Sequence, residues 1–198
     1  KNFDVLNTLI DITQRMVEGE LLQLTLLGKS EITEQQLLDI VERKTAYLFS
    51  GCTKLPALAA GLNHGTAERL AEIGKSLGMA FQLVDDLLDF TSDEKTLGKP
   101  VISDLREGKL TLPLIYLLED NQAEDKGKVQ RVLEDRDFSR VGSEEILEMV
   151  RAHGTLEKAR DLARSYGERA RRELRHFPDN LARRALETLP DLILARDR

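Results

Sequence analysis

Residues 81–90 read Phe-Gln-Leu-Val-Asp-Asp-Leu-Leu-Asp-Phe, so three acids interrupt an apolar run. Upstream of this run, Leu70, Ile73 and Leu77 continue the apolar spacing of three and four that is typical of one helical face. The pattern predicts a long helix that Thr66 caps and that ends near Phe90. The acids therefore lie in the last turns of this helix.

The three acids are Asp85, Asp86 and Asp89. Asp85 and Asp89 are four residues apart and share one helical face, with Asp86 at its edge. Carboxylates this close repel one another, and the negative C-terminal end of the helix dipole increases the cost. A divalent cation removes the conflict, and oxygen ligands without His or Cys favour Mg²⁺ that is shared with a diphosphate. The alternative is a solvated polar stripe on an acidic chain, and the acids alone do not exclude it.

Lysines close to the acids in the sequence support the metal interpretation. Lys99 and Lys109 each follow a glycine in the segment after the acidic helix, and Lys44 stands beside Thr45 on an earlier predicted helix. Lysine binds phosphate as a point charge, and a neighbouring glycine lets the backbone approach a ligand closely. One lysine alone is typical of a solvated surface, but these residues and Gln82 together predict a diphosphate site.

The rest of the chain has the same helical spacing. One helix is predicted from Phe3 toward Gly28, and a capping box of Thr33 and Gln36 predicts the start of the next. From Thr91 to Lys109 the periodicity stops, which predicts a long loop of the kind that often carries function. No strand pattern or linker competes, so we expect one all-α domain over residues 1–198, with further helices around 112–120, 125–135, 143–153, 155–175 and 179–195.

The composition excludes several classes of protein. The 198 residues carry a formal net charge of −6 without a dense basic run, which disfavours nucleic-acid binding. No apolar stretch reaches the roughly 18 residues of a transmembrane helix. The single cysteine, Cys52, cannot form an internal disulfide and is predicted to be a small buried residue in a cytoplasmic protein. The three histidines are scattered, and they predict no zinc site.

The acidic helix and the loop after it resemble the trans-isoprenyl diphosphate synthases, most closely the bacterial octaprenyl type. The resemblance lies in Gly78-Met-Ala-Phe-Gln-Leu-Val-Asp-Asp-Leu-Leu-Asp-Phe90, in Leu-Gly-Lys-Pro100 and in Ser-Asp-Leu-Arg-Glu-Gly-Lys-Leu-Thr-Leu-Pro113. It extends to the ending Ala195-Arg-Asp-Arg198. It implies an isoprenoid synthase-type bundle of helices around a central cavity, usually in a homodimer.

The resemblance also implies roles for individual residues. Asp85, Asp86 and Asp89 correspond to the second Asp-rich motif of the family, which holds Mg²⁺, or Mn²⁺ in its place, against an allylic diphosphate. Lys44, Asp85 and Lys99 are implied as catalytic residues. The implied diphosphate or substrate contacts are Lys44, Thr45, Phe81, Gln82, Lys99 and Lys109, with Asp104 supporting the loop and Gln23 as a weaker correspondence.

One departure from the family pattern is large. No first Asp-rich motif precedes Asp85, and the chain starts at Lys1 without Met, so we expect the N-terminal helices of a longer prenyltransferase domain to be missing from this sequence.

The implied reaction joins isopentenyl diphosphate to an allylic diphosphate of the farnesyl or geranyl type. Two alternatives remain, a non-catalytic helical subunit of a heteromeric prenyl synthase and a terpene cyclase-like enzyme. Peripheral membrane contact during release of an apolar product is a further expectation.

Overall fold

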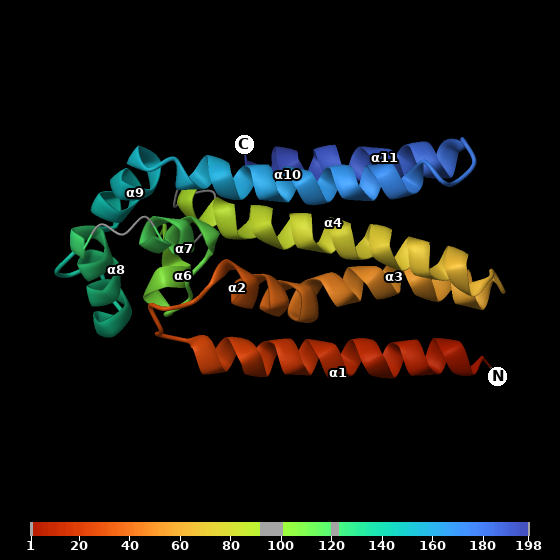
Figure 1. The fold of residues 1–198 in the computed structure, drawn as a ribbon, viewed down its shortest axis with the longest axis horizontal. Coiled ribbons are helices and arrows are strands. Elements are labelled where there is room, and N and C mark those ends of the chain that lie inside the picture. The colour runs from red at the N-terminus through yellow and green to blue at the C-terminus, as the bar shows by residue number, and fades with distance from the viewer. Residues whose placement is uncertain (1, 92–100, 120–122, 198) are drawn as a thin grey trace.

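The computed structural model describes residues 2–91, 101–119 and 123–197, and within them it contains helices and no strand. The predicted all-α class is confirmed. Figure 1 shows the long helices stacked side by side, with α2 in line with α3 and the other short helices gathered at one end. The long elements are α1 (Phe3–Leu26), α3 (Tyr47–Ala59), α4 (His64–Thr91), α10 (Thr155–Leu174) and α11 (Leu181–Leu194). The shorter ones are α2 (Glu34–Val41), α6 (Ser103–Arg106), α7 (Leu112–Glu119), α8 (Ala123–Asp135) and α9 (Ser143–Ala152).

Helix α4 is the centre of the bundle. It lies between α3 and α10 and also contacts α11 (Figure 1). Its apolar positions Ile73, Leu83 and Leu87 are at most 2% exposed, which is the burial that their helical spacing predicts. The acidic end of α4 therefore belongs to a helix that other helices pack against on several sides.

Several local predictions need correction. Asn63 caps α4, since its Oδ1 accepts a hydrogen bond from the backbone N–H of Thr66 at 2.9 Å. The segment predicted as a loop contains the short helix α6, although residues 92–100 lie outside the described part. Cys52 is exposed rather than buried because it lies on a side of α3 that no described helix covers. The capping box of Thr33 and Gln36 is confirmed.

A π-helical segment, η1 (Glu42–Ala46), joins α2 to α3 without a break in the helical path. Sequence periodicity did not predict it, because a single wide turn leaves little trace in the spacing of apolar residues. Lys44 and Thr45 lie inside this segment. The chain ends in a short 3₁₀ helix, η2 (Ala195–Asp197).

No helix in the described ranges is long and apolar enough to span a membrane.

Helices α3 and α4 pack closely at Gly74. A Cβ atom built on Gly74 would lie 2.3 Å from the carbonyl oxygen of Phe49 and 2.4 Å from Oγ1 of Thr53. The Thr53 hydroxyl contacts the carbonyl oxygen of Leu70 at 2.6 Å, so a polar contact also holds the two helices together. Only glycine fits here without a shift of one helix.

We predict that Gly74→Ala lowers the free energy of unfolding by about 2 kcal/mol, because the added methyl group overpacks the contact between α3 and α4. Gly127→Ala on α8 is the matched control. No atom lies within 4 Å of a Cβ built there, so the higher helix propensity of alanine should stabilise the protein by about 0.5–1 kcal/mol. Chemical denaturation measures both effects. Equal effects at the two glycines would contradict the packing described.

Candidate active site

A cavity of about 230 Å³ lies at the end of the bundle where α4 finishes. The C-terminal turns of α1, helix α2, segment η1, the last turns of α4 and the loop after α6 form its walls. One part of the lining is apolar and consists of Leu26, Leu27, Ile32, Leu37, Ile40, Val41 and Leu110. The other part contains the side chains of Gln23, Lys44, Thr45, Gln82, Asp85, Asp86, Asp104, Lys109 and Thr111. Charged and apolar surfaces therefore meet in one cavity.

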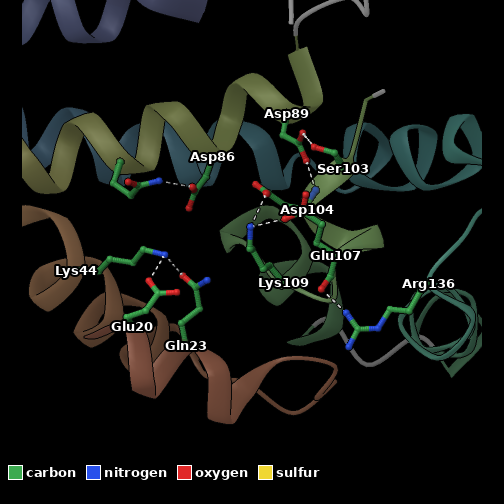
Figure 2. Close-up of polar contacts among 11 residues, drawn as sticks. Glu20, Gln23, Lys44, Asp86, Asp89, Ser103, Asp104, Glu107, Lys109 and Arg136 are labelled. Atoms are coloured by element: carbon green, nitrogen blue, oxygen red, sulfur yellow. Dashed lines mark hydrogen bonds and ion pairs between the residues drawn. The ribbon is translucent and has the colours of Figure 1, made fainter. Parts of the chain in front are cut away.

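Lys44 reaches the cavity because α1 and η1 approach closely. A Cβ atom on Gly19 of α1 would lie 2.6 Å from the backbone nitrogen of Lys44, so a larger residue would push the two elements apart. The Nζ of Lys44 forms an ion pair with Glu20 at 2.7 Å and donates a hydrogen bond to Gln23 at 3.0 Å (Figure 2). The lysine is held in place from α1 while it faces the cavity.

A chain of hydrogen bonds connects η1 to the acidic end of α4. The Thr45 hydroxyl donates to Oε1 of Gln82 at 3.0 Å, and Nε2 of Gln82 donates to Asp86 at 2.9 Å. Gln82 accepts with its oxygen and donates with its nitrogen, so both ends of its amide are used. The chain fixes the orientation of Asp86 toward the cavity.

Asp86 is partly buried at the cavity wall. The pKa of Asp86 is raised to about 7: burial is the largest cause, the hydrogen bond from Gln82 acts in the opposite direction, and the negative charges of Asp104, Asp85 and Asp89 add to the rise. The negative charges of Asp85 and Asp104 thus lie near a carboxyl group that burial already makes harder to ionise. This is the condition in which a cation binds favourably.

Asp89 has a different environment from the other two acids. It is 1% exposed, and its carboxylate accepts hydrogen bonds from the Ser103 hydroxyl at 2.8 Å and from the backbone N–H of Asp104 at 2.9 Å (Figure 2). Its carbonyl oxygen accepts from the backbone N–H of Ile102 at 2.8 Å. Asp89 therefore connects the end of α4 to the start of α6 and does not line the cavity.

The predicted platform of three acids is thus divided. Asp85 and Asp86 line the cavity, and Asp89 supports the loop behind it. Over residues 2–91, 101–119 and 123–197, no group of three His, Cys, Asp or Glu side chains is arranged to hold a metal ion.

Lys109 lies across the cavity from Asp86. Its Nζ is 2.6 Å from Glu107 and 3.5 Å from Asp104 (Figure 2). Burial lowers the pKa of Lys109, but the hydrogen bond and charge of Glu107 and the charge of Asp104 outweigh burial, so the pKa is raised overall. Lys109 therefore remains a cation at neutral pH. Lys99 lies outside the described residues.

Phe81 does not line this cavity. Its ring packs against Phe49 with 5.2 Å between ring centroids, and the guanidinium carbon of Arg196 lies 4.5 Å above it. Nη2 of Arg196 also lies 3.2 Å from Asp85. In the sequence, Arg196 stood out only as part of the ending that resembles the trans-isoprenyl diphosphate synthases. The contact between Arg196 and Asp85 joins residues that are 111 positions apart in the chain, and no local sequence signal predicts it.

The all-α bundle with this charged and apolar cavity is of the isoprenoid synthase class. It superimposes on a decaprenyl diphosphate synthase from Rhodobacter capsulatus with a TM-score of 0.91 and 34% identity, over 100% of this chain and 61% of that one. A polyprenyl synthase from Caulobacter crescentus CB15, complexed with calcium and isoprenyl diphosphate, gives a TM-score of 0.91 and 33% identity over 98% of this chain and 60% of that one. The predicted bundle type is confirmed.

The chain belongs to the polyprenyl synthetase family, whose model matches residues 1–150. It is 35% identical to the octaprenyl diphosphate synthase of Escherichia coli (strain K12) over 194 residues, which cover 98% of this chain and 60% of that protein. It is 33% identical to the geranylgeranyl diphosphate synthase of Saccharolobus solfataricus over 99% of this chain and 58% of that protein. The chain thus spans about three-fifths of the length of these relatives.

The raised pKa of Asp86 gives a pH-dependent prediction. The folded protein holds this proton more tightly than the unfolded chain, so ionisation of Asp86 removes stability as the pH rises from about 4 to 7. In metal-free protein, Asp86→Asn should therefore raise the free energy of unfolding by about 1–2 kcal/mol at pH 8 and have little effect at pH 4. Urea denaturation at both pH values measures the difference, with Asp161→Asn on the exposed surface of α10 as the control. An equal effect of Asp86→Asn at both pH values would contradict this environment.

Proposed function

We propose that the protein carrying this chain is a polyprenyl diphosphate synthase, a prenyltransferase that joins isopentenyl diphosphate head to tail (1'-4) to an allylic diphosphate of the farnesyl or geranyl type. The observation that carries the proposal is the shared cavity of Lys44, Lys109, Asp85 and Asp86 beside an apolar wall. A prenyl diphosphate has the same division into a charged head and an apolar chain.

The residues present fit a hard divalent cation, Mg²⁺ or Mn²⁺. Asp85 and Asp86 are consecutive carboxylates on the cavity wall, and burial together with the negative charges of Asp104, Asp85 and Asp89 raises the pKa of Asp86, a cost that a bound cation would offset. Mg²⁺ commonly takes one or two carboxylates and completes its coordination with water and phosphate oxygens. When bound, the cation supplies positive charge that stabilises the departing diphosphate. Asp89 would act indirectly, since its oxygens are used by Ser103 and Asp104.

The cationic side chains would bind and orient the diphosphate. Lys44 is held by Glu20 and Gln23, and Lys109 by Glu107 and Asp104, so each approaches the ligand from a fixed position. Such preorganised charges stabilise the negative charge that grows as the allylic C–O bond breaks.

The rest of the reaction needs no protein nucleophile. The double bond of isopentenyl diphosphate attacks the allylic carbon, a new C–C bond forms, and a proton leaves the adjacent carbon for the released diphosphate. Apolar residues of the wall, such as Leu37 and Ile40, would help to keep water from the reacting carbons. Because the released diphosphate accepts the proton, no side chain is assigned as a general base.

The two alternatives are less well supported. A non-catalytic subunit would gain nothing from burying Asp86 beside Asp104 and Asp85, an arrangement that raises the pKa of Asp86. The relatives carry the names of chain-elongating synthases, which supports elongation over cyclisation. Assembly as a homodimer, a cytoplasmic location and peripheral membrane contact remain predictions.

Asp85→Ala in the full-length protein should lower prenyl transfer at least about 100-fold, because the substitution removes a carboxylate that we assign to the cation. The assay follows labelled isopentenyl diphosphate and farnesyl diphosphate in the presence of Mg²⁺, and circular dichroism should show unchanged helicity. Glu148→Ala, an exposed position on α9, is the control and should keep wild-type turnover. Turnover by Asp85→Ala near the wild-type rate would refute the role of Asp85.

A further inference from the structure

Arg136 connects the end of α8 to the loop that carries Lys109. We propose that Arg136 is a positioning residue, which holds residues 107–109 in place and so sets the affinity of Lys109 for a diphosphate. The inference rests on the proposed function, since it concerns the same cavity. No sequence pattern singled out this residue.

The backbone of Arg136 is in an unfavourable conformation. Its φ is +58°, in the left-handed region that residues other than glycine rarely adopt, and its N–H donates to the carbonyl oxygen of Val132 at 2.9 Å. Such a conformation costs on the order of 1 kcal/mol and persists where surrounding contacts compensate for it. The contacts of the side chain supply that compensation.

The guanidinium group of Arg136 lies between two glycines. Its Nη1 donates to the carbonyl oxygen of Glu107 (Figure 2). A Cβ atom on Gly108 would lie 1.7 Å from Nη1, and one on Gly28 would lie 2.9 Å from Nη2. The two glycines have φ values of +86° and +77°. The side chain therefore occupies space that exists because both positions lack a Cβ atom.

The same contacts join three separate segments. The backbone N–H of Gly28, after α1, donates to the carbonyl oxygen of Gly108 at 2.8 Å. Arg136 adds the end of α8 to this pair through Glu107. The loop is thus fixed from two sides, by the segment after α1 and by Arg136.

This loop forms part of the candidate active site. Gly108 and Lys109 line the cavity, whereas Arg136 does not. The backbone N–H of Lys109 donates to the carbonyl oxygen of Asp104 at 2.8 Å, and its Nζ contacts the side chains of Glu107 and Asp104. A shift of Glu107 would therefore move the group that orients Lys109. Arg136 acts on the ligand only through these neighbours.

The first test measures the binding of inorganic pyrophosphate with Mg²⁺ by titration calorimetry. Arg136→Gly removes the side chain and relieves the positive φ, so the variant should fold as well as the wild type. We expect it to bind pyrophosphate about fivefold more weakly, which is the scale of one lost hydrogen bond. Arg131→Ala, at an exposed position of α8, removes the same charge and should stay within about twofold of the wild type.

A double substitution tests whether Arg136 acts through Lys109. Lys109→Ala should weaken pyrophosphate binding by itself, and Arg136→Gly should then have no further effect, because its contribution passes through Lys109. A merely structural role would reduce binding equally in both backgrounds. Additive effects would overturn the inference, as would equal losses in Arg131→Ala and Arg136→Gly.

A stability measurement tests the contact without any ligand. Gly108→Ala adds a methyl group where Nη1 of Arg136 lies, whereas Gly154 also has a positive φ but no atom within 4 Å of an added Cβ. Gly108→Ala should therefore destabilise the protein more than Gly154→Ala, and the excess should disappear when Arg136→Gly is also present. If the excess destabilisation by Gly108→Ala persists in the presence of Arg136→Gly, the proposed contact between Arg136 and Gly108 is wrong.

The outcomes separate this inference from the proposed function. If Lys109→Ala weakens pyrophosphate binding and Arg136→Gly does not, the role of Arg136 is wrong and the proposed function stands. If neither substitution changes binding, the assignment of the cavity to a diphosphate is wrong as well.

Discussion

The carboxylate of Asp89 is buried at the C-terminal end of α4, where the helix dipole opposes a negative charge. It accepts hydrogen bonds from the hydroxyl of Ser103 and the backbone N–H of Asp104, and these bonds offset part of the cost of its burial. The bonds also fix where α6 starts relative to α4. Asp104 takes part in this contact and Lys109 follows it by five residues. The contact therefore places both residues at the cavity that Asp86 lines.

The remaining site geometry depends on close approaches elsewhere in the bundle. Gly19 lets α1 reach the backbone of Lys44, and Gly74 lets α3 reach α4. The hydrogen bonds of Gln82 then connect η1 to the acidic end of α4. A neighbouring residue orients each polar side chain in these contacts, so little rearrangement would be needed when a charged ligand enters. Such preorganisation is the general basis of electrostatic stabilisation in enzymes.

Sequence reasoning captured the features that have a local or periodic signal. The long helices follow from apolar spacing, and the structure brings six of the predicted metal and substrate residues to one cavity: Lys44, Thr45, Gln82, Asp85, Asp86 and Lys109. The features that were missed depend on tertiary contacts. They are the π-helical turn at Lys44, the burial of Asp89 by α6, and the contacts of Arg136 and Arg196. Identical acids in one motif therefore have different environments, which their spacing alone cannot distinguish.

In the proposed site, Asp85 and Asp86 face the ligand while Asp89 supports the loop. Anomalous diffraction from crystals of the protein with Mn²⁺ and pyrophosphate tests it most directly, because it places the metal independently of any assay. We expect a manganese peak bonded to the carboxylate of Asp85 or Asp86, with Asp89 still bound to Ser103 and Asp104. A peak bonded to Asp89, or no peak in the cavity, would contradict it.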